Sequence, residues 1–231
     1  MTDSAQPRPD EFQPPESPPA AIPMLGEAVE AIEALLPHPV ESIDEAGPHT
    51  IAPPHERSAV DRFDQAVDHA FDRLRGNPVA DRLFYAATEL GDFGLIWVLL
   101  GATHALRSDR DVAVAARLAA TLGVESVLVN GVIKSFFKRE RPVSQEPRPY
   151  NMRMPRTTSF PSGHSSTAVV ACILLSEANP SLAPAYWTVA AVVASSRVYV
   201  KIHHASDVVG GVATGLVIGL TARTLWRRLA R

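Results

Sequence analysis

The stretch SFPSGH, residues 159–164, stands directly before an apolar run at residues 167–175. Pro161 and Gly163 favour a tight turn, so this stretch is expected to be a loop that leads into a helix. A hydroxyl group, free backbone N–H groups and an imidazole would then meet at a helix N-terminus, where the helix dipole favours an anion. An ordinary Pro-Gly loop without a ligand explains this stretch equally well when it is taken alone.

The run at residues 167–175 is one of four or five apolar segments. Each is near the length of about 20 residues that crosses a bilayer, except that this run is marginal, although small residues extend it on both sides. Arg117 and Glu125 interrupt the second segment, so buried helices of a soluble all-α protein are the alternative. Membrane spans are favoured because the segments recur with too little chain between them to wrap a soluble core, and Gly211 and Gly215 fit close helix packing in lipid. We therefore predict an all-α membrane bundle of about five transmembrane helices, at residues 83–106, 112–137, 167–175, 182–200 and 208–225.

Two further segments precede these spans. Residues 58–75 carry apolar side chains every three or four positions and predict an amphipathic helix, which residues 76–78 (GNP) would end. This helix fits either a membrane interface or the surface of a soluble core. Residues 1–57 are rich in Pro and acidic residues and predict a disordered tail, separate from a membrane domain at residues 58–231. Within the tail, residues 24–36 fit a short acidic helix that is either transient or docks on a protein partner.

A basic cluster ends the second predicted span. Lys134 and Arg141 are seven residues apart, about two helical turns, so both side chains are expected to project from one face of the helix end. Taken alone, such a cluster is typical of a membrane-interface anchor. A loop rich in Pro and Arg then leads to the SFPSGH stretch.

A second group of polar residues follows the fourth predicted span, which ends in Ser196 and Arg197. His203 and Asp207 are i and i+4 neighbours if this segment is helical, so the carboxylate can accept a hydrogen bond from one imidazole nitrogen. The other nitrogen then keeps a lone pair, as a base or a nucleophile requires. Such pairs often only solvate a helix face. His204 would point about 100° away on a helix and is interpreted as a bystander.

Three motifs thus stand in a fixed order: KSFFKRERP at residues 134–142, PSGH at residues 161–164 and SRVYVKIHHASD at residues 196–207. Their order and spacing resemble the tripartite signature of the type 2 phosphatidic acid phosphatase superfamily, which also includes vanadium haloperoxidases. The resemblance covers about residues 61–226, so the acidic tail lies outside it. Each motif is weak by itself, whereas three in this order are specific, and they imply a membrane lipid phosphatase.

The resemblance implies three catalytic residues. His203 would attack phosphorus and form a phosphohistidine, while Asp207 would fix the tautomer of its ring. His164 would protonate the leaving alcohol and then take a proton from the water that hydrolyses the intermediate. One imidazole must therefore start neutral and the other protonated.

The resemblance also implies the residues that bind the phosphate. Lys134, Arg141 and Arg197 would neutralise the phosphate oxygens. The Ser162 hydroxyl and the Gly163 N–H would assist them. Three fixed cations can replace the magnesium ion of other phosphotransfer enzymes, so no metal and no other cofactor is expected.

A phosphate pocket at the ends of membrane spans suits a substrate that is anchored in the same bilayer. The resemblance implies a lipid phosphomonoester or pyrophosphate: phosphatidate, phosphatidylglycerophosphate, polyprenyl pyrophosphate or a polyprenyl-linked sugar phosphate. The enzyme would be a multi-pass protein of a bacterial-type plasma membrane, with no nucleic-acid partner. The start of the chain lacks a basic, apolar leader, and the loop at residues 134–156 is positive; both favour a cytoplasm-facing site. Arg227 and Arg228 near the C-terminal end favour the opposite orientation, so both sides stay open. A cytoplasm-facing site would suit a polyprenyl-phosphoribose phosphatase of cell-wall precursor synthesis.

Two other functions stay open as alternatives. A soluble vanadate-dependent haloperoxidase would use the same kind of pocket, but span-like hydrophobic segments argue against it. A membrane scaffold without activity would recruit a partner through its acidic tail, but complete motifs argue against that.

Overall fold

The computed structural model describes residues 58–106, 108–144 and 147–229, so the predicted tail and its short acidic helix lie outside the described residues. Within these ranges the protein consists of helices and loops without a β-strand, which confirms the all-α prediction. The α-helices are α2 (Ala59–Asp72), α3 (Pro78–Gly91), α4 (Leu95–Ala105), α5 (Asp109–Ser126), α6 (Gly163–Ala178), α7 (Ala183–Tyr199) and α8 (Ala205–Leu229). Shorter pieces are a π-helical segment, Val127–Val132, and 3₁₀ turns at Asp92–Gly94, Ile133–Phe136 and Pro180–Leu182.

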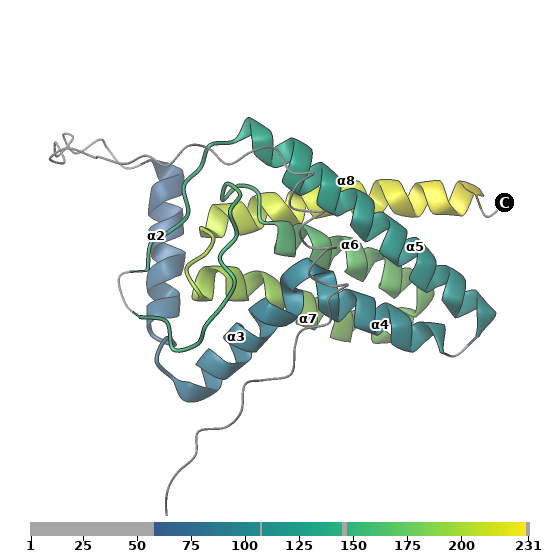
Figure 1. Ribbon diagram of the computed structural model, residues 1–231, viewed down its shortest axis with the longest axis horizontal. Helices are drawn as coiled ribbons and strands as arrows, with labels where there is room; N and C mark the ends of the chain where they lie inside the picture. The colour runs from purple at the N-terminus through teal and green to yellow at the C-terminus, as the bar shows by residue number, and fades with distance from the viewer. Residues whose placement is uncertain (1–57, 107, 145–146, 230–231) are drawn as a thin grey trace, which may run out of the picture. The chain divides into compact units, whose positions relative to one another are not determined.

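Helix α2 confirms the predicted amphipathic helix. Ser58 caps its N-terminus, because the Ser58 hydroxyl accepts the Asp61 N–H and the Asp61 carboxylate accepts the Ser58 N–H, both at 3.1 Å. Gly76 follows the helix with a φ of 82°, a conformation that favours glycine. α2 runs across one end of the bundle, beside α7 and the start of α8 (Figure 1). It turns Asp64 towards the protein, whereas Phe63 is 45% exposed.

The first predicted span is not one continuous helix. A 3₁₀ turn at Asp92–Gly94 separates α3 from α4. Phe93 and Gly94 have φ values of 53° and 69°, so the backbone is left-handed here and the chain bends. The segment predicted at residues 83–106 therefore contains a bend that its apolar pattern did not predict. The bend places Asp92 against α6.

The second predicted span is a helix that ends irregularly. α5 continues into the π-helical segment and a 3₁₀ turn, which together cover residues 127–136. The chain becomes extended at Phe137, with φ and ψ of −120° and 131°. Arg141 precedes Pro142, a position that disfavours helical backbone. The expectation that Lys134 and Arg141 share a helix face is therefore wrong, because Arg141 lies in the loop.

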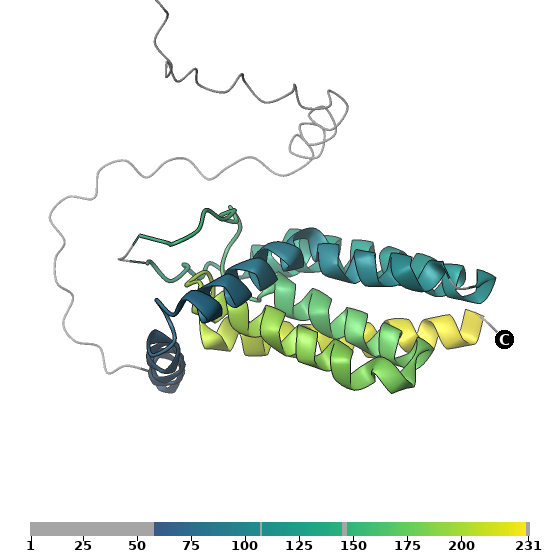
Figure 2. The same ribbon diagram turned by 90° about the horizontal axis from the view of Figure 1, so that it is seen from below.

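Helix α6 lies in the middle of the bundle, against α5, α7 and α8. Figure 2 shows two layers, α4 with α5 and α6 with α7 and α8. Two glycines of α8 let α8 approach α6 closely. A Cβ atom at Gly211 would lie 2.3 Å from the Ser162 carbonyl oxygen, and one at Gly215 would lie 2.5 Å from that of Ser166. The predicted role of these glycines in close helix packing is confirmed.

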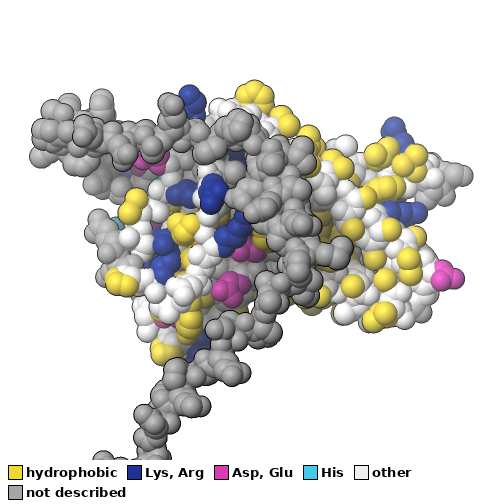
Figure 3. Space-filling view, in the orientation of Figure 1, with side chains coloured by type: hydrophobic (Ala, Val, Ile, Leu, Met, Phe, Trp, Pro, Cys, Tyr) yellow, Lys and Arg dark blue, Asp and Glu magenta, His cyan; other side chains and the backbone are white. Residues whose placement is uncertain are grey.

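Three helical stretches of the described residues are long and apolar enough to cross a membrane: Pro78–Ala105, Asp111–Phe136 and Ala205–Leu229. They coincide with the first, second and fifth predicted spans. The third and fourth correspond to α6 and α7, which have 16 and 17 residues and fall short of the usual length of about 20. Figure 3 shows hydrophobic side chains over α4, α5 and the C-terminal part of α8, where exposed residues include Val98, Val124 and Val217.

Candidate active site

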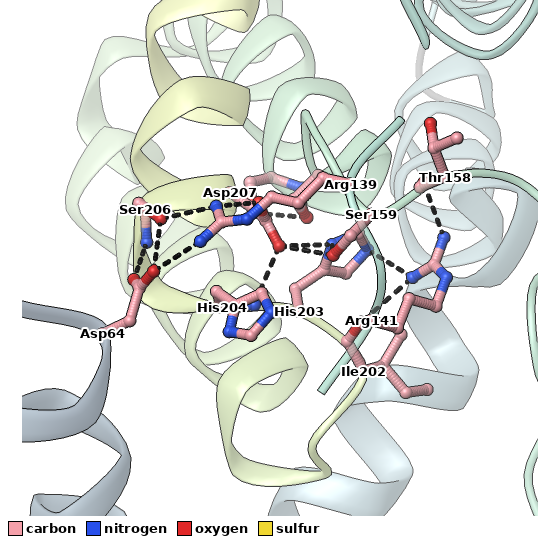
Figure 4. A network of polar contacts seen from close by, with 12 residues as sticks. Asp64, Arg139, Arg141, Thr158, Ser159, Ile202, His203, His204, Ser206 and Asp207 are labelled. Atoms are coloured by element: carbon pink, nitrogen blue, oxygen red, sulfur yellow. Dashed lines mark hydrogen bonds and ion pairs between the residues drawn. The ribbon is translucent and has the colours of Figure 1, made fainter. Parts of the chain in front are cut away.

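The three sequence motifs meet in one polar site. Figure 4 shows part of it, where Arg139 and Arg141 lie beside His203 and Asp207. Backbone hydrogen bonds hold the motifs together. The Ser162 N–H donates to the Asp207 carbonyl oxygen at 3.0 Å, which ties the loop before α6 to the start of α8. The Ser159 N–H donates to the Arg139 carbonyl oxygen at 2.9 Å, which ties the same loop to the chain that follows α5. Polar side chains from three distant parts of the chain therefore share one site.

His203 and Asp207 form the predicted pair, with 3.5 Å between His203 Nδ1 and Asp207 Oδ2. The expectation that both lie on one helix is wrong, because His203 lies in the loop before α8, which begins at Ala205. The fully buried Asp207 carboxylate also accepts the backbone N–H of His204 at 2.8 Å. This contact caps the N-terminus of α8 and explains why the helix starts after His204. His204 therefore contacts the site through its backbone N–H, and its ring does not lie on a helix.

The contacts of the His203 ring identify which nitrogen carries the lone pair. The Nη1 atom of Arg141 lies 3.1 Å from His203 Nε2. A guanidinium group has only hydrogens to donate, so Nε2 must accept and the ring hydrogen must be on Nδ1, facing Asp207. Nε2 is thus the nitrogen that can act as a nucleophile.

The surroundings of His203 keep its ring neutral. Burial lowers the pKa of His203 to about 3. Nearby positive charges lower this pKa as well; they belong to Arg197, Arg141 and Lys134. The hydrogen bond with Asp207 acts against them and raises the pKa of His203. Arg141 stays charged at neutral pH, because burial lowers its pKa only to about 10.

Arg197 is almost fully buried, with 1% of the residue exposed. Its Nη1 donates to the Thr88 hydroxyl. Its Nε and Nη2 have no hydrogen-bond partner among the residues that the structure describes. A buried charge with unused donors is costly unless an anion accepts them. These two N–H groups are therefore suited to bind a phosphate, which guanidinium groups bind with two parallel hydrogen bonds.

Lys134 and Arg141 converge on Thr157 although only Lys134 lies on a helical turn. Lys134 is buried, and its Nζ donates to the Thr157 hydroxyl at 3.1 Å. Arg141 lies 3.4 Å from the same hydroxyl and donates to the Ile202 carbonyl oxygen at 3.1 Å. Since Ile202 is the neighbour of His203, this contact fixes Arg141 beside the His203 ring.

The SFPSGH stretch is a loop that enters α6, as predicted. The Ser162 hydroxyl oxygen caps α6 by accepting the Ser165 N–H at 3.4 Å, and it also accepts the Ser165 hydroxyl at 3.0 Å. A serine hydroxyl keeps one hydrogen to donate, so the predicted contact with phosphate remains chemically available. A Cβ atom at Gly163 would lie 3.3 Å from the Asn130 Oδ1 atom, which leaves little room for a larger residue.

His164 lies in the first turn of α6 and faces the bend between α3 and α4. Its Nε2 is 3.0 Å from Asp92 Oδ1 and 3.3 Å from the Thr88 carbonyl oxygen. Thr88 also binds Arg197 through its hydroxyl, so it links the two site residues. Asp92 orients the His164 ring and supplies a negative charge that would stabilise the ring when it is protonated. The sequence signal for Asp92 was weak, an acidic residue that interrupts the first apolar run.

Three residues to which the sequence motifs assign no role complete the surroundings of Asp207. Arg139 Nη1 donates to Asp207 Oδ1 at 2.5 Å, and its Nη2 donates to Asp64 Oδ2 at 2.6 Å. The Ser159 hydroxyl donates to Asp207 Oδ2 at 2.5 Å. Nothing in the sequence separates Arg139 from its neighbour Lys138, and Asp64 is one of several acidic residues in α2. Only the tertiary structure identifies them.

Comparisons with known proteins agree with this geometry. A family model described as the PAP2 superfamily matches residues 114–231. A decaprenylphosphoryl-5-phosphoribose phosphatase from Mycolicibacterium smegmatis is 34% identical over 144 residues, which are 60% of this chain and 74% of that protein. One from Mycobacterium tuberculosis is 33% identical over 125 residues, 54% of this chain and 67% of that protein. The crystal structure of a transmembrane PAP2 type phosphatidylglycerolphosphate phosphatase from Bacillus subtilis has a TM-score of 0.53 and 26% identity, covering 75% of this chain and 89% of that one.

Proposed function

The chain belongs to the PAP2 superfamily as a membrane phosphatase, and from this premise we propose that it removes the terminal phosphate from a polyprenyl-linked sugar phosphate. The observation that carries the proposal is the buried Arg197, whose Nε and Nη2 have no hydrogen-bond partner among the described residues and which lies close to the neutral His203. The two decaprenylphosphoryl-5-phosphoribose phosphatases support the choice of a polyprenyl-linked pentose phosphate over a glycerophospholipid.

In the first step, the lone pair of His203 Nε2 attacks phosphorus and the bond between phosphorus and the sugar oxygen breaks. Asp207 accepts a hydrogen bond from the Nδ1–H group of His203 and so stabilises the positive charge that develops on the ring. His164 gives its proton to the departing sugar oxygen. The products of this step are the dephosphorylated lipid and a phosphohistidine.

In the second step, His164 takes a proton from water, and the resulting hydroxide attacks the phosphohistidine. The nitrogen–phosphorus bond breaks, inorganic phosphate leaves, and the electron pair returns to His203 Nε2. Asp92 holds His164 in position for both proton transfers, because its carboxylate lies 3.0 Å from the ring.

Positive charge supplied by the protein would stabilise the phosphate in both steps. Lys134, Arg141 and Arg197 carry it, with the Ser162 hydroxyl and the Gly163 N–H as further donors. Fixed cations in a buried site act strongly because water does not screen them. We therefore expect turnover without an added metal ion or other cofactor.

The proposed enzyme acts in the membrane as a multi-pass protein. Residues 58–231 would form the phosphatase domain and residues 1–57 a tail outside it. We count α6 and α7 as spans beside the three longer stretches, which gives five. Five spans and a cytoplasmic tail put the site on the cytoplasmic side. A cysteine at Ser144 should then resist an impermeant thiol reagent in intact cells, and labelling there would place the site outside.

The proposed activity is tested by phosphate release from purified protein in detergent with EDTA. The panel holds decaprenylphosphoryl-5-phosphoribose, phosphatidylglycerophosphate, phosphatidate and undecaprenyl pyrophosphate. The highest kcat/KM is expected for the phosphoribose lipid, with no activity in His203→Ala. A preference for phosphatidylglycerophosphate would overturn the substrate assignment, and undiminished turnover by His203→Ala would overturn the mechanism.

A further inference from the structure

A chain of charged side chains connects the surface helix α2 to Asp207 (Figure 4). Arg139 stands in its middle: its Nη1 donates to Asp207 Oδ1 at 2.5 Å and its Nη2 donates to Asp64 Oδ2 at 2.6 Å. Asp64 belongs to α2 and Arg139 to the loop after the second span, so the contact joins parts 75 residues apart in sequence. Asp64 is 7% exposed, Asp207 is fully buried and the Arg139 side chain is 28% exposed.

Asp64 also fixes the start of α8, which carries Asp207. Its Oδ1 accepts the backbone N–H of Ser206 at 2.7 Å, and its Oδ2 accepts the Ser206 hydroxyl at 2.8 Å. Arg139 Nη1 donates to the same hydroxyl oxygen at 2.7 Å. An N–H group in the first turn of a helix has no partner within the helix, so Asp64 satisfies a donor of α8 from outside.

Arg139 determines how the Asp207 carboxylate is rotated. Asp207 Oδ2 faces the Nδ1 of His203 and accepts the Ser159 hydroxyl and the His204 N–H. Arg139 binds the opposite oxygen, Oδ1, and so prevents the group from turning. Without Arg139, two buried carboxylates would face each other without a cation between them, and their repulsion would move Asp207 away from His203.

We propose that Arg139 and Asp64 are positioning residues for the Asp207–His203 pair, which makes α2 part of the apparatus that orients the nucleophile. This rests on the proposed function, since a nucleophilic His203 is its premise. Neither residue is placed against the phosphate. Their loss should therefore lower kcat and leave KM nearly unchanged.

Asp68 offers a matched control on the same helix. It lies one turn after Asp64 and binds Arg75 Nη2 at 2.6 Å and Lys201 Nζ at 3.4 Å. It thus helps to hold α2 on the protein, but among the described residues it makes no ion pair or hydrogen bond that leads to Asp207. Lys138→Ala is the corresponding control for Arg139→Ala, because this substitution removes the same charge from the adjacent position of the same loop.

The test compares Arg139→Ala, Asp64→Asn, Lys138→Ala and Asp68→Asn as purified full-length proteins, with the lipid phosphate that the wild type hydrolyses best. For Arg139→Ala and Asp64→Asn we expect kcat to fall about 10- to 100-fold, as for other residues that orient a catalytic group. KM should stay within about twofold. Both controls should keep the wild-type kcat. The Arg139→Ala/Asp64→Asn double variant should have about the same kcat as the more impaired single variant, because the two side chains act as one unit.

Chemical rescue separates positioning from folding. Methylguanidinium should restore part of the kcat of Arg139→Ala, since the Arg139 side chain is partly exposed, and should leave Lys138→Ala unchanged. The inference is overturned if Arg139→Ala keeps the wild-type kcat, if Asp68→Asn loses as much as Asp64→Asn, or if methylguanidinium has no effect. A wild-type protein that hydrolyses no lipid phosphate would instead overturn the proposed function.

Discussion

Gly91 lies so close to His164 that a Cβ atom at residue 91 would stand 2.6 Å from Cδ2 of the His164 ring. The ring occupies the space above α3 that a side chain would otherwise fill. The close approach lets the nearby Asp92 carboxylate reach His164 Nε2 at 3.0 Å. The position of His164, the proposed general acid, therefore depends on a glycine outside the three sequence motifs.

Gly91→Ala should displace His164 and lower kcat about 10- to 100-fold, because small misplacements of a catalytic group have effects of this size. Phosphate release by the purified variant measures it. Gly123→Ala is the matched control, since a Cβ atom there would meet no atom from elsewhere in the described part of the chain within 4 Å, and it should retain full activity. Equal activities of the two variants would show that His164 is not held by this contact.

The acid limb of the pH profile should reflect the low pKa of His203. Burial lowers this pKa to about 3, so the ring stays neutral and nucleophilic between about pH 7 and about pH 5. Arg141→Gln removes a positive charge that lowers the pKa, so the acid limb of kcat/KM should move to higher pH. Titration of the substrate phosphate affects the wild type and Arg141→Gln equally, so it cannot cause a difference between their profiles. If the acid limbs of the two profiles coincide, the prediction is wrong.

Arg197 should lower the stability of the protein without a ligand and should be needed for anion binding. In Arg197→Met the buried unpaired charge is gone, so the unfolding temperature without ligand should be at least that of the wild type. Orthovanadate, a phosphate analogue, should raise the unfolding temperature of the wild type and have no effect on the variant. Thermal unfolding with and without vanadate measures both. A similar vanadate-dependent rise in the variant would remove Arg197 from the phosphate site.

The glycines of α8 should tolerate substitution to different degrees. A Cβ atom at Gly215 would meet the Ser166 carbonyl oxygen at 2.5 Å, whereas one at Gly219 would meet the flexible Ile173 side chain at 2.7 Å. Gly215→Ala should therefore reduce the free energy of unfolding by about 1–3 kcal/mol, and Gly219→Ala by less. Denaturant unfolding in detergent tests the order, and the reverse order would contradict the α6–α8 packing.

Much of the fold could be predicted from the sequence, because helix periodicity and apolar length are local properties. The amphipathic helix at residues 58–75 and the loop into α6 are examples. The backbone conformation of individual site residues was harder to predict. Lys134 and Arg141 both reach the Thr157 hydroxyl, but from different backbone conformations, since Pro142 excludes Arg141 from the helix. His203 lies before α8 because Asp207 caps the N-terminus of α8. Spacing singled out these residues, but it predicted the wrong backbone conformation for Arg141 and His203.

The remaining site residues could not be predicted, because their roles arise from tertiary contacts. Lys138 and Arg139 are adjacent basic residues, and only the fold turns Arg139 towards Asp207. Asp92 reaches His164 only because the first span bends at residues 92–94. The motifs assign these residues no role, and burial and pairing alone distinguish them from their neighbours.

The most direct test of the central claim is to locate the covalent phosphate. p-Nitrophenyl phosphate has a leaving group that needs no proton, so His164→Ala should still complete the first step and stall before hydrolysis. We predict a burst of about one nitrophenolate per enzyme and an acid-labile phosphate on the peptide that contains His203. A burst with the phosphate on another residue, or turnover without any covalent phosphate, would contradict His203 as the nucleophile.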